Sequence, residues 1–382
     1  MVRIFSLSSS TAYQSFIKPV LFRQPPDVVH SRLLKLSALY QRLPFSVRIV
    51  NKIWAYHNDA ILKQTVDGIT FHNPVGLSAG FDKNIELLPT MQSIGYGFMT
   101  GGSVTYKPCE GNPRPWFYRL PKSKSLIVNV GLANQGAERI RQRIETYKAK
   151  WFTEFPLIVS VAKTNNSENC NDDEAIADYV GSLEIIRDEE RVAVYELNIS
   201  CPNAYGGEPF TTPKRLDKLL TAVDALFLTK PVWVKMPINL SWQDFNALLQ
   251  VIVKHHVTTV VIGNLNKQRS GNQLKDTIPA GTMGNLSGLP TQKLSNDLIA
   301  KTYRKYHTQL TIVGVGGIFS AEDAYRKICL GASLVGLVTG MIFKGPQLIG
   351  QINNELAQLV EKEGFQNISE AIGSYEHQKL YS

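Results

Sequence analysis

Cysteine is scarce in this sequence, and the few residues of this type stand far apart. There are four, Cys109, Cys170, Cys201 and Cys329, and no two of them form a Cys-x-x-Cys pair. That spacing argues against a zinc site, a disulfide framework and an iron–sulfur cluster bound within the chain. We expect most of the four to be ordinary core residues. Only Cys201 stands in a context that suggests chemistry.

Long hydrophobic runs are absent as well. No apolar stretch approaches the roughly 20 residues that a helix needs to span a bilayer. The first residues lack the long apolar core and the small-residue cleavage site of a secretory signal. The chain has 382 residues, of which 43% are hydrophobic and 19% charged, a composition typical of a globular protein. We therefore expect it in the cytoplasmic compartment.

Acidic residues are nearly missing from the segment 13–56, where Asp27 is the exception. The formal charge of +9 fits a nucleic-acid surface, an anionic membrane or a solvated surface with no special partner. Charge alone favours the last of these, so its distribution has to decide. The excess is partly local, because seven basic residues crowd this segment: Lys18, Arg23, Arg32, Lys35, Arg42, Arg48 and Lys52.

The same segment predicts two or three short helices, broken at Pro25-Pro26 and at Pro44. Pro19 is tolerable only in the opening turn of the first. The second is clearer, because apolar residues recur at helical spacing with basic residues to one side. They are Val29, Leu33, Leu36, Tyr40 and Leu43. Such helices either lie in a membrane interface or pack as a cap on the end of a larger fold. Both interpretations apply if one face of the helix packs and the opposite face binds lipid.

From residue 69 onward, short apolar runs alternate with longer helical patterns. Continuous runs such as 157–159 suit strands that are buried on both faces of a parallel sheet. Eight strand-then-helix units predict a (β/α)₈ barrel with a small N-terminal helical extension, divided into 1–66 and 67–382. The strands are expected at 74–79, 97–101, 157–162, 193–199, 231–236, 258–263, 311–315 and 333–338. The helices are expected near 84–94, 135–150, 172–190, 213–228, 241–255, 291–306, 320–330 and 346–363.

In a barrel, functional residues gather at the C-terminal ends of the strands. Six of the predicted strands end in residues of this kind: 79–83, 198–203, Lys235, 263–264, 314–317 and 339–340. Glycine turns after the last two strands let backbone amides approach an anion, and a following helix adds partial positive charge. Because 314–317 is not a G-x-G-x-x-G fingerprint, a bound mononucleotide fits better than a dinucleotide.

The polar residues at these ends suggest how a ligand is held. Lys235 ends a buried strand and needs an anionic partner, which the N1–C2=O edge of a reduced flavin supplies. Lys83 can hold a substrate carboxylate. The amides of Asn198, Asn203 and Asn264 suit a planar ring with N–H and C=O groups, and Cys201 can act as base or nucleophile. No histidine stands at a strand end, which disfavours hydrolase triads and metal-dependent hydrolysis.

These residues resemble the dihydroorotate dehydrogenases, and the similarity covers nearly the whole chain from about Tyr13. Its most specific stretches are 73–83, 102–115, 198–203, 286–290 and 313–318. The resemblance implies FMN bound by Ala79, Gly80, Ser103, Asn198, Lys235, Gly288, Gly316, Gly317, Val338 and Thr339. It implies dihydroorotate bound by Lys83, Asn129, Asn198, Asn203 and Asn264. It also implies that Cys201 removes the C5 proton while the C6 hydride passes to the flavin, under a loop that closes.

The resemblance is mixed between two branches of that family. The N-terminal helices and 117–119 resemble the membrane-associated branch that uses quinone, in which serine is the usual base. Cys201 and Ser160 resemble the soluble branch, which uses fumarate or NAD, and Val338 stands where the quinone branch often has tyrosine. Asn129 stands one position later than the family's substrate-binding asparagine. We predict quinone as acceptor, with Arg119 at the polar end of its tunnel and the protein peripheral on the cytoplasmic side of the cell membrane.

Three alternatives remain open from the sequence. The first is the same reaction with fumarate or NAD as acceptor. The second is an FMN-dependent tRNA-dihydrouridine synthase, whose RNA the charge of +9 would suit. Against it, the basic residues concentrate in the N-terminal segment, and we expect no nucleic-acid partner. The third is a degenerate barrel that binds flavin or lipid without catalysis.

Overall fold

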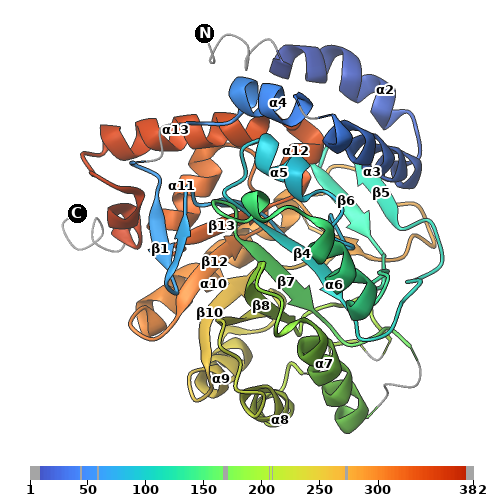
Figure 1. Cartoon of the computed structure of the whole chain (residues 1–382), viewed down its shortest axis with the longest axis vertical. Helices are drawn as coiled ribbons and strands as arrows, with labels where there is room; N and C mark the ends of the chain where they lie inside the picture. The colour runs from blue at the N-terminus through green and yellow to red at the C-terminus, as the bar shows by residue number, and fades with distance from the viewer. Residues whose placement is uncertain are drawn as a thin grey trace.

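The centre of the molecule is a closed barrel of eight parallel strands (Figure 1). The computed structural model describes residues 9–43, 45–57, 60–166, 171–205, 207–208, 210–271 and 274–375, so Cys170 lies outside the described residues. Around the barrel the strands follow the order β10-β12-β13-β3-β4-β7-β8-β9. In chain order they are β3 Val75–Leu77, β4 Phe98–Val104, β7 Leu157–Val161, β8 Val192–Asn198, β9 Val232–Met236, β10 Val257–Ile262, β12 Thr311–Val315 and β13 Leu334–Leu337. The predicted fold is confirmed.

Helices surround this barrel where the sequence predicts them. They are α5 Leu88–Ser93, α6 Ala137–Thr146, α7 Asp172–Ile186, α8 Pro213–Asp224, α9 Trp242–Ile252, α10 Gln292–Tyr306, α11 Ala321–Cys329 and α13 Leu348–Lys362. Shorter ones are η2 Ala149–Trp151, η3 Leu289–Thr291, α12 Thr339–Lys344 and η4 Ile368–Ala371. The helix expected near 84–94 begins later, at Leu88, because the Asp82 carboxylate accepts hydrogen bonds from the amides of Glu86 and Leu87 and holds that stretch as a loop.

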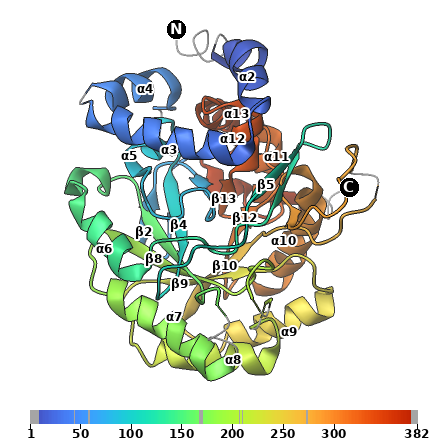
Figure 2. The same cartoon turned by 90° about the vertical axis from the view of Figure 1, so that its right-hand side faces the viewer.

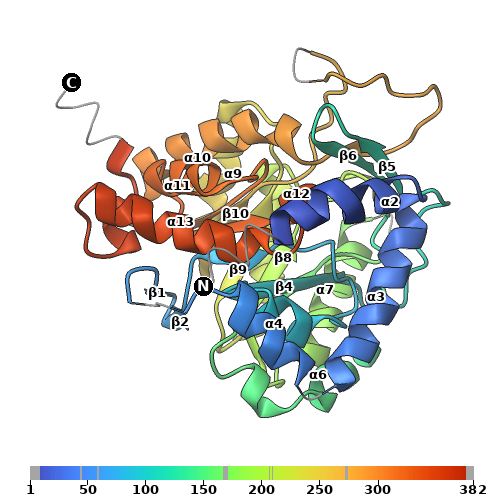
Figure 3. The same cartoon turned by 90° about the horizontal axis from the view of Figure 1, so that it is seen from above.

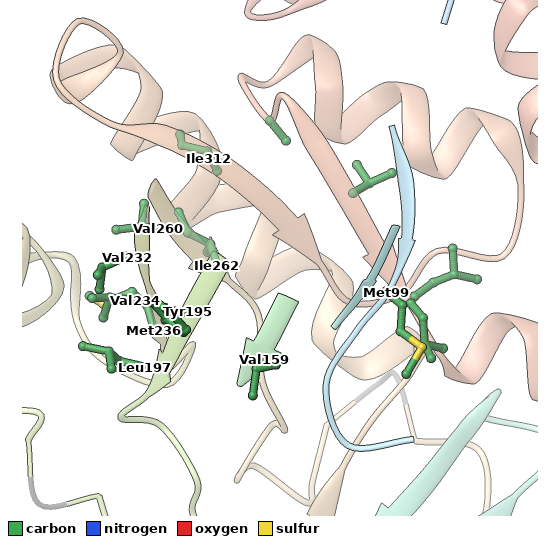
Figure 4. Close-up of a cluster of buried hydrophobic side chains, with 14 of the residues drawn as sticks. Met99, Val159, Tyr195, Leu197, Val232, Val234, Met236, Val260, Ile262 and Ile312 are labelled. Atoms are coloured by element: carbon green, nitrogen blue, oxygen red, sulfur yellow. The ribbon is translucent and has the colours of Figure 1, made fainter. Parts of the chain in front are cut away.

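Side chains alternate along each barrel strand between the interior and the helical layer. In β9, Val232, Val234 and Met236 point outward into the main core (Figure 4), whereas Trp233 points into the barrel. The lower part of the barrel interior is an apolar layer to which seven strands contribute: Phe98, Ile158, Val194, Trp233, Val261, Val313 and Leu334. The next inward residues toward the C-terminal ends, such as Ser160 and Lys235, are polar, so the alternation itself delivers polar groups to the barrel mouth.

A short hairpin closes the opposite, N-terminal end of the barrel. Its strands are β1 Gln64–Val66 and β2 Ile69–Phe71, and its Val66 and Phe71 join the apolar layer inside the barrel. In the turn, the Asp67 carboxylate accepts a hydrogen bond from Nε1 of Trp233 at 2.7 Å. The predicted boundary after residue 66 therefore divides one structural unit. The extension ends before this hairpin.

A second sheet, which the sequence pattern did not predict, lies beside the barrel mouth. It consists of β5 Phe117–Leu120, β6 Ser125–Val128 and β11 Asn285–Leu286, in the order β11-β6-β5. Figure 3 shows β5 and β6 next to α2 and α3, at the edge of the barrel. These strands belong to two long connections between barrel strands. The alternation of strands and helices that predicts the barrel does not extend to those connections.

The N-terminal extension forms three helical segments on one side of the barrel (Figure 2). They are η1 Tyr13–Ile17 running directly into α2 Lys18–Phe22, then α3 Pro26–Arg42 and α4 Ser46–Trp54. The break at Pro25-Pro26 is confirmed. Pro19 lies in the first turn of α2, as predicted, directly after the π-helical turn η1. The interrupted i→i−4 pattern there accommodates a residue without an N–H.

Specific bonds hold this extension against the barrel. The buried Asp27 carboxylate accepts hydrogen bonds from the amides of Trp116, at 3.1 Å, and Phe117. The Tyr13 hydroxyl donates to the carbonyl of Ile342 at 2.8 Å. The predicted cap is therefore present, while the outer surface of the extension stays apolar: Phe16 is 73% exposed, Leu36 61% and Phe45 70%. Within the described residues, no helix is long and apolar enough to cross a membrane.

Candidate active site

A cavity of about 260 Å³ occupies the C-terminal mouth of the barrel and continues beneath α3 and β5. All but one of the residues predicted for cofactor, substrate and catalysis line it. They are Ala79, Gly80, Lys83, Ser103, Arg119, Asn198, Cys201, Asn203, Lys235, Asn264, Gly288, Gly316, Gly317, Val338 and Thr339. These residues come from distant parts of the chain, and the parallel strands bring them together because all their C-terminal ends meet at one edge.

Asn129 is the exception. It follows β6 directly, and its neighbours Val128 and Val130 line the cavity whereas Asn129 does not. Successive side chains of an extended chain point to opposite faces, so a shift by one position turns the amide away. Its Oδ1 instead accepts a hydrogen bond from Nδ2 of Asn112 at 3.0 Å. The prediction that Asn129 contacts a substrate is not supported by this geometry.

A chain of hydrogen bonds organises the polar floor of the cavity. Oγ of Ser103 lies 2.9 Å from Oγ of Ser160 and accepts a hydrogen bond from Nδ2 of Asn198 at 2.8 Å. Oδ1 of Asn198 accepts from the amide and the hydroxyl of Ser200, and the amide of Asn264 donates to Ser200 Oγ at 2.6 Å. The orientation of Asn198 and Asn264 is thus fixed before any ligand arrives.

The two glycine turns lie side by side, as the sequence predicts, because β12 and β13 pair directly. Gly316 and Gly317 have φ angles of 107° and 71°, which a residue with a side chain rarely adopts. A Cβ on Gly317 would also lie 2.4 Å from Cβ of Gln292. Nε2 of Gln292 donates to the carbonyl of Gly317 at 2.7 Å and holds this turn. Gly340 lies in the first turn of the adjacent helix α12, so backbone groups of both segments can approach a phosphate closely.

Two buried ammonium groups face the cavity without partners. Nζ of Lys83 has no hydrogen-bond acceptor within the described residues. Lys235 is 6% exposed, and no hydrogen bond or ion pair joins its side chain to any residue that the structure describes. Burial lowers the pKa of Lys83 to about 8, against the opposing effect of Asp82 and Asp27. A buried cation without an anion is costly, so both positions call for anionic ligand groups.

Cys201 lies in the loop after β8, at the edge of this polar floor. Burial raises the pKa of its thiol above the ordinary value of 9.0, while the amide of Asn203 and the charge of Lys235 oppose that rise. The loop is held closed from several sides. Asn112 Nδ2 donates to the carbonyl of Asn203 at 3.0 Å, and Lys163 Nζ donates to the carbonyl of Tyr205 at 2.9 Å.

The outer part of the cavity is formed by the extension. Four residues of α3 at helical spacing line it, Pro26, Val29, His30 and Leu33, opposite Arg119. Arg119 donates to the carbonyl of Gln24 at 2.6 Å. His30, which the sequence reading missed, is neutral, because burial and the nearby Lys83 and Arg114 lower its pKa to about 3. Its place on the Val29–Leu33 stripe is the signal that could have identified it.

The sequence matches the family model for dihydroorotate dehydrogenase over residues 61–360. This chain belongs to the dihydroorotate dehydrogenase family. It is 34% identical to the dihydroorotate dehydrogenase (quinone) of Deinococcus deserti, covering 95% of this chain and 99% of that protein. It is 30% identical to the enzyme of the same name from Acaryochloris marina, over 94% and 99% of the two chains.

Solved structures of this family have the same fold. The dihydroorotate dehydrogenase of Eimeria tenella in complex with ferulenol superposes with a TM-score of 0.83 at 26% identity, covering 94% of this chain and 99% of the other. The ligand-free enzyme of that organism gives a TM-score of 0.81. These matches include the extension, so both the barrel and the helices above its mouth are features that this chain shares with its relatives.

The site fits the FMN expected of a dihydroorotate dehydrogenase. The glycine turns at 316–317 and 340 can approach its phosphate, and Thr339 Oγ1 lies 3.0 Å from Ser287 Oγ on the same rim. Lys235 is a buried cation in the wall of the same cavity, so it can bind an anionic group of the cofactor. A Cβ built on Gly80 would meet no atom within 4 Å, so the wall there is open to a bulky planar group. The residues present therefore match the group.

Proposed function

We propose that this chain oxidises dihydroorotate to orotate in pyrimidine biosynthesis, with FMN as hydride acceptor and a quinone as final electron acceptor. The observation that carries this proposal is the shape of the single main cavity. It joins the polar mouth of the barrel, where Cys201 and the amides lie, to an apolar arm under α3 whose lining includes Arg119. The relatives from Deinococcus deserti and Acaryochloris marina are named dihydroorotate dehydrogenase (quinone), which agrees with it.

Each polar residue has a defined task toward the substrate. The Lys83 ammonium binds the carboxylate, which gives that buried charge the partner it lacks. The amides of Asn198, Asn203 and Asn264 bind the ring edge of dihydroorotate through its N–H and C=O groups. Cys201, as the thiolate, removes the C5 proton. Because its loop is bonded to Asn112 and Lys163, the thiol reaches the substrate in a site from which water is excluded.

The residues that would hold FMN are Ala79, Gly80, Ser103, Asn198, Lys235, Gly288, Gly316, Gly317, Val338 and Thr339. The chemistry that FMN supplies when bound is acceptance of a hydride and release of the electrons to a second acceptor. Lys235, a buried cation that lines the cavity, would stabilise negative charge on the bound flavin. Gly316, Gly317 and Gly340 present backbone to the phosphate.

The apolar arm suits a quinone that arrives from a membrane. Val29, Leu33 and Ile342 line it, and Arg119 supplies a donor for a quinone oxygen. On their outer side, the helices of the extension expose apolar side chains, and basic residues lie among them. The exposed apolar residues are Phe16, Ile17, Val20, Leu36, Leu39, Leu43, Phe45 and Ile49. A patch of this kind on short helices favours insertion into an anionic interface. We place the protein peripherally on the cytoplasmic side of the cell membrane.

One titration tests the reaction. The purified protein is predicted to be yellow from bound FMN, and anaerobic dihydroorotate should bleach it with a stoichiometry of one per chain. The Asn203→Ala variant should need more dihydroorotate, because a ring contact is lost. Protein that carries FMN but keeps its colour with excess dihydroorotate would refute the proposal and leave the degenerate barrel as the better account.

The same oxidation with fumarate or NAD as acceptor is the second candidate. Cys201 and Ser160 favour it, since both resemble the soluble branch of the family. Ser160 lies under the site, bonded to Ser103. The apolar arm under α3 favours quinone, because a charged fumarate gains nothing from apolar walls.

A further inference from the structure

A second cavity, of about 300 Å³, lies beside the main one between α3 and the loops of the barrel mouth. Its walls differ from the apolar arm. They carry amides, a hydroxyl and charged groups: Ser31, Lys83, Asn84, Glu86, Glu110, Arg114, Asn134 and Gln135. Arg114 is 56% exposed, stacks on the Trp116 ring at 4.0 Å and pairs with Asp27 at 3.5 Å. The cavity thus has a cationic group near its outer side.

The two cavities share two residues, His30 and Lys83. Lys83 therefore stands in the wall between them. Its Nζ is buried and has no acceptor within the described residues, and its nearest aromatic neighbours are the rings of Trp116 and Phe117, at 5.8 and 5.5 Å. An unpartnered ammonium that borders a polar cavity attracts an anion from that side. The other shared residue, His30, adds no competing charge because it is neutral.

The main cavity offers an anion a poor route from outside. Its arm under α3 is lined by Val29 and Leu33 and opens toward the apolar outer face of the extension. A carboxylate loses its hydration on such a path with nothing in return. The polar cavity presents an exposed cation, Arg114, and a buried one, Lys83. It also carries the carboxylates of Glu110 and of Glu86, which pairs with Arg143 at 3.9 Å. Its volume is near the lower end for small-ligand sites.

We propose that this second cavity, which we term the polar vestibule, is the passage through which the carboxylate substrate reaches Lys83 and the product leaves. This inference rests on the proposed oxidation of dihydroorotate. The anion and the quinone would then use separate entrances on either side of α3, so neither has to leave before the other enters.

Filling the vestibule tests the route. Ser31→Phe places a ring in the cavity and removes no hydrogen bond that the structure records for that side chain. In holoenzyme, stopped-flow bleaching by dihydroorotate should show an association rate lower by about tenfold or more. Orotate should dissociate more slowly by the same factor, so that its equilibrium Kd is unchanged. A site damaged in another way would change Kd. Ser37→Phe, two turns along α3 and outside both cavities, is the matched control.

A charge variant gives a second, independent test. Arg114→Gln should lower the association rate of dihydroorotate and weaken its dependence on salt, because steering by the outer cation is lost. Arg42→Gln, at the end of α3, should change neither. Unchanged association rates in both Ser31→Phe and Arg114→Gln would overturn the vestibule and point to opening of the Cys201 loop. If the wild-type protein itself is not bleached, the failure lies in the proposed function instead.

Discussion

Cys201 combines two conflicting demands, since a base must lose its proton and burial opposes that loss. Burial raises the pKa of the thiol above 9.0, and Lys235 and the Asn203 amide only oppose this in part. The thiolate is therefore a minor species at neutral pH in the free site. Single-turnover bleaching at saturating dihydroorotate should accelerate with pH from 6 to 9 without levelling.

Replacement of this thiol tests the assignment directly. Cys201→Ala should slow bleaching by about 10²- to 10⁴-fold, the usual contribution of a positioned base. FMN content and the affinity for orotate should stay close to those of the wild type. Near-normal turnover of Cys201→Ala across the pH range would show that another group is the base.

Titration of Lys83 predicts a pH dependence of the KM for dihydroorotate. With a pKa of about 8 in the free protein, its ammonium is lost as the pH rises through 8, and the carboxylate loses its partner. The KM for dihydroorotate should therefore rise above pH 8 while kcat does not fall. Lys83→Met should raise KM by about ten- to a hundredfold at pH 7, as expected for a charge-assisted bond, and should abolish the pH dependence of KM. A KM that is flat in the wild type would contradict this role.

Lys327 is a buried lysine that lines neither cavity, so its titration should affect stability rather than catalysis. It is fully buried and donates to Ser295 Oγ at 2.6 Å and Asn296 Oδ1 at 2.8 Å, and burial lowers its pKa to about 7. Between pH 7 and 10.5 the unfolded chain binds a proton there that the folded chain does not. Stability should therefore rise with pH in that window.

Thermal unfolding measures this effect. The melting temperature of the wild type minus that of Lys327→Met should increase from pH 7 to pH 10, whereas the same difference for Lys362→Met, an exposed lysine of α13, should stay constant. If this difference in melting temperature changed with pH equally in the two variants, the proposed titration of the buried Lys327 would be contradicted.

Residues at strand ends were predictable because barrel geometry fixes where they go. Asn198, Lys235 and Gly317 needed only the strand count and the alternation of side chains. The positions of Asn129 and His30 relative to the cavity were not predictable in this way, because both residues lie in elements outside the repeating barrel units. The position of Asn129 relative to the cavity follows from the register of β6, and His30 faces the cavity only because α3 lies across the mouth.

At the level of elements, the extension covers the barrel mouth with one face, and we propose that its other face contacts the membrane. Its inner face is held by Asp27 and Tyr13. Its outer face exposes Phe45 and its neighbours. The amphipathic stripe predicted both packing on the barrel and contact with a membrane. It did not predict which residues serve each purpose, because that depends on which residues contact β5. The sheet of β5, β6 and β11 escaped prediction since its short strands carry no repeating pattern.

The membrane patch can be tested with matched phenylalanines. Phe45→Glu should weaken binding to anionic vesicles by about tenfold or more, as loss of one buried aromatic side chain and gain of a like charge imply. Phe227→Glu, at a still more exposed position far along the chain (86% exposed, against 70% for Phe45), should leave binding unchanged. Vesicle sedimentation gives both values. Equal binding of the two variants would show that the extension does not insert.

At the scale of the whole molecule, two cavities of opposite character meet at Lys83 and His30. Their separation predicts that the two half-reactions respond to different substitutions. Val29→Phe narrows the apolar arm and should slow reoxidation by quinone while leaving bleaching by dihydroorotate unchanged. This is the reverse of the result expected for Ser31→Phe. Loss of both half-reactions in either variant would argue against separate entrances.

The choice of acceptor decides the account as a whole. Enzyme reduced anaerobically with one equivalent of dihydroorotate is mixed in a stopped-flow instrument with a soluble quinone or with fumarate, and the return of flavin absorbance is followed. We predict rapid reoxidation by quinone and little by fumarate on the same timescale. Rapid reoxidation by fumarate but not by quinone would contradict the proposed acceptor.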